Sequence, residues 1–163
     1  MTSTFDEITV AQEDPRQPEM ETLIFELNAF LSAQTPPEFC FQLTIDQMVS
    51  DDVVVLVARD GYDRALGCGA LRILPASWGD RWGEVKRMYV KDEAKGRGVG
   101  SRILETIEAE ARTRGLTRLV LETGLQPTHP GAHATYIKAG FTERGTFGDY
   151  PNSDWNVFFE KPL

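Results

Sequence analysis

The sequence predicts a mixed α/β protein in which helices cover both faces of one central sheet. Apolar β-branched segments alternate with amphipathic ones, antiparallel hairpins precede a strand–helix–strand unit, and glycines cluster between a strand and a helix of that unit. We expect the order β–α–α–β–β–β–α–β–α–β–β within a single domain that spans residues 1–163.

The first half of the chain is predicted to hold strands at residues 5–10, 53–59 and 65–74 and helices at residues 20–31 and from residue 44. Pro18 belongs to the loop before the first helix, in which Leu23 and Leu27 lie at helical spacing. Thr44 and Gln47 form a capping-box pattern that begins the second helix. The next two segments are apolar and rich in β-branched residues, which favours strands.

The second half is predicted to hold strands at residues 82–90, 119–123, 141–146 and 156–161 and helices at residues 99–114 and 130–139. Asp60 and Gly61 form the turn of a hairpin that joins the two strands before this unit. Gly115 and Gly140 are expected to close the two helices, because glycine tolerates the left-handed backbone found at helix ends.

Composition excludes several classes of function. The 163 residues include 17 Lys and Arg against 25 Asp and Glu, a net charge of −8 that argues against general DNA or RNA binding. The longest apolar run is far shorter than the ~18 residues of a membrane span, and the acidic N-terminus does not resemble a secretory signal. Cys40 and Cys68 match no metal or redox spacing. We therefore expect a cytoplasmic protein with reduced thiols, no metal and no membrane partner.

The charge is unevenly distributed. Residues 81–102 contain seven Lys or Arg and three Asp or Glu, a net charge of +4 that leaves −12 for the rest of the chain. Such a basic stretch is typical of a site for a small anion, although a solvated charged loop has the same composition.

The most informative segment lies between the strand 82–90 and the following helix and reads Lys95-Gly96-Arg97-Gly98-Val99-Gly100. Three glycines let the backbone turn tightly and approach a ligand, and the N–H groups of the helix N-terminus attract anions. The segment lacks the Gly-Lys-Ser/Thr of a nucleotide triphosphatase loop, and Ser101 stands at the last position of a dinucleotide fingerprint. We therefore predict that the segment holds a pyrophosphate, but not that of a hydrolysed nucleoside triphosphate or of a dinucleotide cofactor.

Two motifs resemble the GNAT N-acetyltransferase superfamily. The first is a strand that ends at Val90, followed by Lys95, Gly98 and Gly100 where the family has Arg/Gln-x-x-Gly-x-Gly/Ala. The second, A-x-x-x-Y-x-K-x-G-F, is matched by Ala132, Tyr136, Lys138, Gly140 and Phe141, with His129 in place of the family's usual Asn. The resemblance covers at least residues 66–163, and segments 84–90, 121–124 and 147–163 look like a bacterial subgroup of small stand-alone acetyltransferases.

The resemblance implies a mostly antiparallel sheet in which the fourth strand, 82–90, splays away from the fifth, 119–123, with acetyl-CoA in the gap. Pantetheine would pair with the fourth strand, whose N–H groups would also face the thioester oxygen, and the pyrophosphate would sit on the amides of residues 97–101. The cofactor-binding residues it implies are Met88, Tyr89, Val90, Lys95, Gly96, Arg97, Gly98, Val99, Gly100, Ser101 and Tyr136.

The resemblance also implies catalytic roles. Tyr136 matches the tyrosine that protonates the CoA thiolate, and Glu84 matches the general base of some members. Glu122 is an alternative base, Glu84 could instead be solvated and paired with Lys86 or Arg87, and His129 and His133 are more typical of cap or surface positions. Strand alternation places Glu84, Lys86, Met88 and Val90 on one face unless a bulge intervenes.

The acceptor is expected to be a primary amine of a small molecule or a peptide. Loops 35–41 and 147–155 would select it, with the acids Glu38, Asp149 and Asp154 as candidate contacts for a cationic amine. The sequence does not determine the oligomeric state, and dimers are common among relatives. A GNAT-fold module that binds or senses acyl-CoA without catalysis is the alternative function, and the presence of both Tyr136 and Glu84 favours the enzyme.

Overall fold

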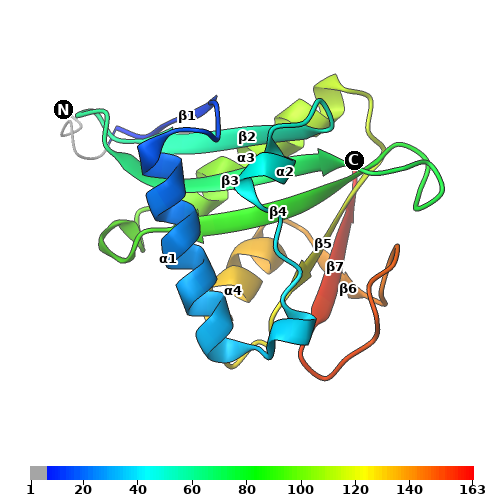
Figure 1. The fold of residues 1–163 in the computed structure, drawn as a ribbon. Coiled ribbons are helices and arrows are strands. Elements are labelled where there is room, and N and C mark those ends of the chain that lie inside the picture. Colours follow the sequence, from blue (N-terminus) through cyan, green and yellow to red (C-terminus); the bar gives the residue numbers. More distant parts are fainter. Residues whose placement is uncertain (1–6) are drawn as a thin grey trace.

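The computed structural model of the chain describes residues 7–163 and has the predicted order of elements (Figure 1). The strands are β1 (Thr9–Gln12), β2 (Val53–Arg59), β3 (Ala65–Ile73), β4 (Trp82–Val90), β5 (Arg118–Thr123), β6 (Thr142–Arg144) and β7 (Val157–Pro162). The helices are α1 (Pro18–Gln34), α2 (Ile45–Met48), α3 (Val99–Thr113) and α4 (Pro130–Lys138), with 3-10 turns at Pro37–Phe39 and Asp92–Ala94.

The seven strands form one sheet in the order β1-β2-β3-β4-β5-β7-β6. All neighbouring pairs are antiparallel except β4 and β5, which run parallel because α3 connects them. The predicted mixed sheet is confirmed, and α1 and α2 cover one face of it while α3 and α4 cover the other. We call these the α1 face and the α3 face.

The parallel pair of strands is joined at one end only. Pairing runs from Trp82 with Arg118 to Val85 with Leu121, and the last five residues of β4 have no partner on β5. Figure 1 shows the two strands diverging beyond this point. The predicted splay is therefore present, and it leaves the β5 side of β4 without backbone partners in the described part of the sheet.

A bulge in β4 changes which side chains share a face. Lys86 pairs with Ala70 and Tyr89 with Cys68, so two residues, Arg87 and Met88, oppose a single residue of β3. Arg87 has a φ of 55°, a backbone conformation uncommon outside glycine. The exception allowed for the alternation is thus met: a bulge intervenes, and Glu84 and Lys86 do not share a face with Met88 and Val90.

The bulge shifts the alternation of side chains along β4 by one residue. Met88 and Val90 pack into the core of the α3 face with Val85, whereas Tyr89 packs against the cluster under α1. Glu84 and Lys86 also lie on the α1 face, since Lys86 contacts the loop before α2. The strand therefore presents apolar side chains towards α3 and polar ones towards α1.

The α3 face holds the larger core. Ile103, Leu104 and Ile107 of α3 are fully buried, and the helix packs against β2, β3 and β4. Burying each such side chain contributes roughly 1.5–3 kcal/mol, so this stripe fixes the helix that carries the glycine segment at its start. Within residues 7–163, no helix is long and apolar enough to cross a membrane.

Several element ends differ from the sequence prediction. The helix α1 begins at Pro18 rather than after it, because the first turn of a helix needs no N–H from that residue and the fixed proline φ suits it. The first strand was expected at residues 5–10; it runs from Thr9 to Gln12, and residues 5 and 6 lie outside the described part. The predicted strand 141–146 is only three residues long.

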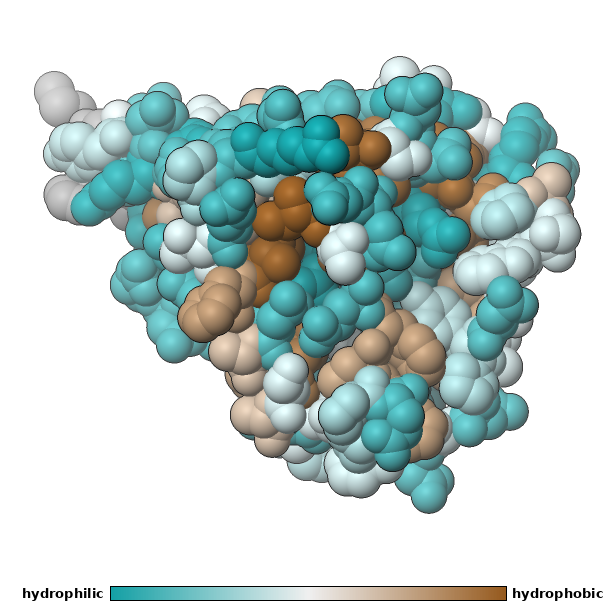
Figure 2. All heavy atoms as spheres, in the orientation of Figure 1, coloured by the Kyte–Doolittle hydropathy of each residue, from teal (hydrophilic) through white to brown (hydrophobic). Residues whose placement is uncertain are grey.

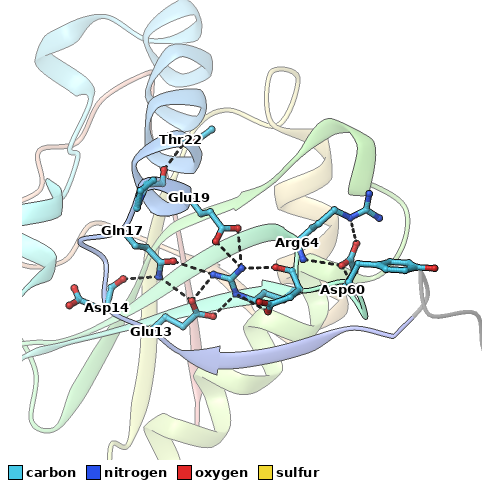
Figure 3. Close-up of polar contacts among 11 residues, drawn as sticks. Glu13, Asp14, Gln17, Glu19, Thr22, Asp60 and Arg64 are labelled. Atoms are coloured by element: carbon cyan, nitrogen blue, oxygen red, sulfur yellow. Dashed lines mark hydrogen bonds and ion pairs between the residues drawn. The ribbon is translucent and has the colours of Figure 1, made fainter.

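A partly buried charge network fixes α1 to the sheet. Arg59 at the end of β2 donates to both Glu13 oxygens, at 2.8 and 2.9 Å, and to Glu19 of α1 at 3.0 Å. Figure 3 shows how Glu13, Gln17 and Glu19 converge on this point. The guanidinium lowers the pKa of Glu13, because its hydrogen bonds favour the charged carboxylate.

Candidate active site

The glycine segment forms an open turn at the N-terminus of α3. Gly96 and Gly98 have φ values of 78° and 77°, and a Cβ added at either would meet no atom within 4 Å. Gly98 is the N-cap residue, and the first N–H groups of α3 have no partners within the helix. The turn therefore leaves both room and donors for an anionic group.

Lys95 and Arg97 supply cations beside this turn. The Lys95 side chain is mostly exposed and pairs with Asp92 at 2.7 Å. Lys86 and Arg87 belong to the same basic stretch of sequence but point to the α1 face. The basic stretch is thus divided between two sites, and only part of it can serve an anion at the glycine turn.

Tyr136 lies on α4 in the core of the α3 face. Its ring packs at 5.9 Å from that of Phe141 and 6.1 Å from that of Phe159. The hydroxyl makes no hydrogen bond with any residue of 7–163. Burial, and after it the charge of Glu122, raises the pKa of this hydroxyl, so it keeps its proton well above neutral pH.

Glu84 is fully buried within a network that sequence reasoning did not find. Its Oε2 accepts a hydrogen bond of 2.5 Å from Tyr150, whose oxygen accepts one of 2.8 Å from Lys86. Arg72 lies at 3.7 Å from Oε1, which has no hydrogen-bond partner. The alternative of a solvated Glu84 paired with Lys86 or Arg87 is wrong about solvation, because Tyr150 from the loop before β7 covers the carboxylate. The pairing with Lys86 is present, at 3.6 Å.

Glu122 occupies a more open position on β5. It is half-buried and accepts a hydrogen bond of 2.6 Å from Asn156. Burial raises its pKa, although Asn156 and the charge of Lys86 act in the opposite direction. A carboxylate with a raised pKa, electrostatically coupled to Tyr136, has the properties of a proton acceptor.

The two histidines lie between α4 and the end of β5. His133 Nε2 is 2.7 Å from the carbonyl oxygen of Gly124, and its ring contacts Phe159. His129 is buried at the N-cap of α4 with its ring against Phe30 of α1, and burial lowers its pKa. His129 has one of the cap or surface positions expected for the two histidines, but the expectation is wrong for His133, which is buried within α4.

A cleft of about 770 Å³ opens on the α1 face beside α2, on the side of the molecule shown in Figure 2. We call it the α2 cleft, and it is lined by Cys40, Phe41, Gln42, Leu43, Asp46, Gln47, Ser50, Asp52, Val53, Arg72, Trp78, Lys86, Asp149 and Tyr150. Both predicted acceptor loops contribute to it, but Glu38 and Asp154 do not line it. Both cysteines are free thiols, and only Cys40 reaches the cleft.

The inner wall of the cleft is aromatic and basic. Phe41 and Tyr150 meet edge to face at 5.1 Å, and Lys86 bonds to the Tyr150 hydroxyl. Lys86 also donates to the carbonyl oxygen of Phe41, at 3.4 Å. The wall therefore joins β4 to both loops.

The sequence model of the Acetyltransferase (GNAT) family matches residues 10–141. An IAA acetyltransferase of Azospirillum brasilense is 41% identical over 157 residues, which cover 96% of this chain and 98% of that protein. Among solved structures, a proposed acyl-CoA N-acyltransferase of Klebsiella pneumoniae is 31% identical and superimposes with a TM-score of 0.78, covering 97% of this chain and 99% of that one.

More distant structures share the fold. The PaiA N-acetyltransferase of Thermoplasma acidophilum, crystallised in complex with coenzyme A, superimposes with a TM-score of 0.71 at 18% identity. The superposition covers 96% of this chain and 99% of that one. A protein with this fold has thus been crystallised with coenzyme A.

Proposed function

The chain belongs to the GNAT acetyltransferase family, and from that premise we propose that it transfers an acetyl group from acetyl-CoA to a primary amine. One observation carries the proposal: the glycine turn, the unpaired end of β4 and Tyr136 surround the same opening of the sheet. A Cβ added at Gly100, for example, would lie within 4 Å of the side chains of both Val90 and Thr135, the residue before Tyr136. Pyrophosphate, pantetheine and thioester each have a matching group there.

We assign the diphosphate to the N–H groups of residues 97–101, with Lys95 and Arg97 beside it. Gly96 and Gly98 keep that space open, and Val99, Gly100 and Ser101 provide the first turn of the helix. The pantetheine arm pairs with the free edge of Met88, Tyr89 and Val90 as an added strand.

The proposed reaction is a direct attack in a ternary complex. The amine nitrogen forms a bond to the thioester carbon, and an N–H of residues 88–90 stabilises the oxyanion that develops. The C–S bond then breaks, and Tyr136 gives its proton to the departing thiolate. The raised pKa of Tyr136 supports this role, because the hydroxyl keeps the proton that it is to donate at neutral pH.

A base must take a proton from the ammonium form of the acceptor. Glu84 and Glu122 are both candidates, and burial separates them. Glu84 is covered by Tyr150, so a proton could reach it only through that hydroxyl or through Lys86. The half-buried position and raised pKa of Glu122 support its assignment as the base, with Glu84 orienting Tyr150.

The test is acetyl-CoA turnover measured as free thiol against a panel of polyamines, amino acids, aminoglycosides, peptides and IAA. IAA is included because the Azospirillum relative is named for it. Thiol release that depends on the amine supports the enzyme. Tight binding of coenzyme A without such release would instead identify a non-catalytic acyl-CoA-binding module.

A further inference from the structure

Three buried side-chain atoms of residues 7–163 lack a hydrogen-bond partner: Glu84 Oε1, Arg87 Nε and His129 Nε2. Buried polar atoms are seldom left unpaired, so each needs an explanation. Glu84 and Arg87 both lie on β4 near its separation from β5, and His129 lies at the start of α4 beyond β5. The unpaired atoms therefore gather around the opening of the sheet.

Arg87 is the member of this set that has a charge without an opposite charge beside it. Its residue is only 7% exposed, and its guanidinium donates from Nη2 to the neutral amide of Asn28 in α1. It forms no ion pair with any carboxylate of residues 7–163. The neighbouring Cys68 thiol does not provide a negative charge, since burial raises its pKa to about 12.

Two partly buried cations of the described residues are, by contrast, paired. Arg59 binds Glu13 at 2.8 Å, and Lys86 lies at 3.6 Å from Glu84. A buried charge without a partner carries a large desolvation penalty, and buried charges in proteins are paired as a rule. Arg87 is moreover held at a φ of 55°, a sparsely populated backbone conformation that recurs at functional sites. Both features point to an anion supplied by a ligand.

The position of Arg87 distinguishes the acceptor from the acyl donor. The glycine turn lies at the start of α3, on the opposite face of the sheet from α1. The guanidinium points the other way, towards Asn28, which is half-buried and thus reaches solvent. Its neighbour Lys86 lines the α2 cleft. Arg87 itself does not line that cleft, but it faces the same α1 face, so an anion would reach it from that side, beside Asn28.

A guanidinium matches a carboxylate in shape, because Nε and one Nη can donate in parallel to its two oxygens. Arg87 has Nε free for such a pair. We propose that Arg87 binds a carboxylate of the acceptor, so that the substrate is an amine that also carries a carboxylate, such as an amino acid. This inference rests on the proposed acetyltransferase function and names its substrate class.

The first test compares amines that differ only in the carboxylate: L-phenylalanine with 2-phenylethylamine, L-lysine with 1,5-diaminopentane, and γ-aminobutyrate with propylamine. The expected result is a kcat/KM at least ~10-fold higher for the acid of the best pair, lost in Arg87→Gln mainly through KM. Arg87→Lys should retain part of it. Arg112→Gln, on the exposed side of α3, is the matched control and should change nothing. Equal or better turnover of the decarboxylated amines, or a preference that survives in Arg87→Gln, overturns the proposal.

The second test needs no turnover. N-acetyl-L-phenylalanine and its amide are titrated calorimetrically into the protein loaded with coenzyme A. Binding of the acid at least ~10-fold tighter than that of the amide supports the proposal, and equal binding refutes it. Failure of every amine to release thiol would count against the proposed function alone, since this binding comparison still decides the role of Arg87. The affinity for coenzyme A and the Tm verify that each variant is folded.

Discussion

Gly98→Asp is the most direct perturbation of the proposed donor site. Gly98 has a φ of 77° and open space around its missing Cβ, so the Cβ of an aspartate there would meet no other atom within 4 Å. The left-handed conformation costs a non-glycine residue roughly 1–2 kcal/mol, and less for aspartate, which adopts it more readily than most. The fold should therefore tolerate the change with a Tm lower by a few degrees.

The effect on coenzyme A binding should be much larger. The new carboxylate would occupy the space that the diphosphate needs. Two like charges about 4 Å apart repel by about 4 kcal/mol at a protein surface, and salt reduces this to about 2 kcal/mol or more. A loss of about 2 kcal/mol corresponds to a Kd raised at least ~30-fold, before any steric exclusion is counted.

The assay is calorimetric titration of coenzyme A, with Gly115→Asp as the matched control. Gly115 follows the other end of α3 with a φ of 73° and equally open surroundings, so its substitution imposes the same backbone strain far from the glycine turn. We expect Gly115→Asp to bind coenzyme A normally and Gly98→Asp to lose binding. An unchanged affinity in Gly98→Asp would refute the assignment of the diphosphate to this turn.

Three further predictions concern catalysis and stability. Tyr136→Phe should lower kcat at least ~10-fold with little change in coenzyme A affinity, and unchanged turnover would remove Tyr136 from the mechanism. Glu122 must be ionised to accept a proton, so kcat/KM should fall as the pH drops through the pKa of Glu122, which burial raises above 4.5. This acidic fall in kcat/KM should be absent in Glu122→Gln. If it persists in Glu122→Gln and is lost in Glu84→Gln, the base is Glu84. The folded pKa of Glu13 lies below its unfolded value of 4.5, so the stability it provides is present above pH 4.5 and is lost as the pH falls through the folded pKa. Arg59→Met should destabilise the protein by about 2–3 kcal/mol at neutral pH and make its stability less dependent on acid pH. Chemical denaturation at several pH values measures both effects, and unchanged stability or an unchanged acid dependence would contradict the prediction.

The local patterns of the sequence predicted the elements well. β2 and β4 have the predicted bounds, and the capping box of Thr44 and Gln47 is formed in full. Gly98 and Gly115 adopt the left-handed conformations that their positions at the ends of α3 require. These features depend on residues close together in the chain, so periodicity and turn chemistry are sufficient to find them.

The arrangement around Glu84 could not be read in the same way. Tyr150 reaches Glu84 across 66 positions of sequence, and only the folding of the last loop over the sheet brings them together. The position of the bulge at Arg87 could likewise not be predicted from the sequence, because arginine carries no preference for a positive φ. That bulge moves Met88 and Val90 to the α3 face and leaves Arg87 facing α1, which separates the two sites along one strand.

The central claim, acetyl transfer to an amine, is tested most directly by counting both products in one reaction. Acetyl-CoA and the best acceptor of the panel are incubated with the enzyme, free thiol is titrated, and the acetylated amine is quantified by mass spectrometry. The account predicts equal amounts of the two products, both strongly reduced in Tyr136→Phe. Saturable binding of coenzyme A with thiol release no faster than in the absence of amine would contradict it.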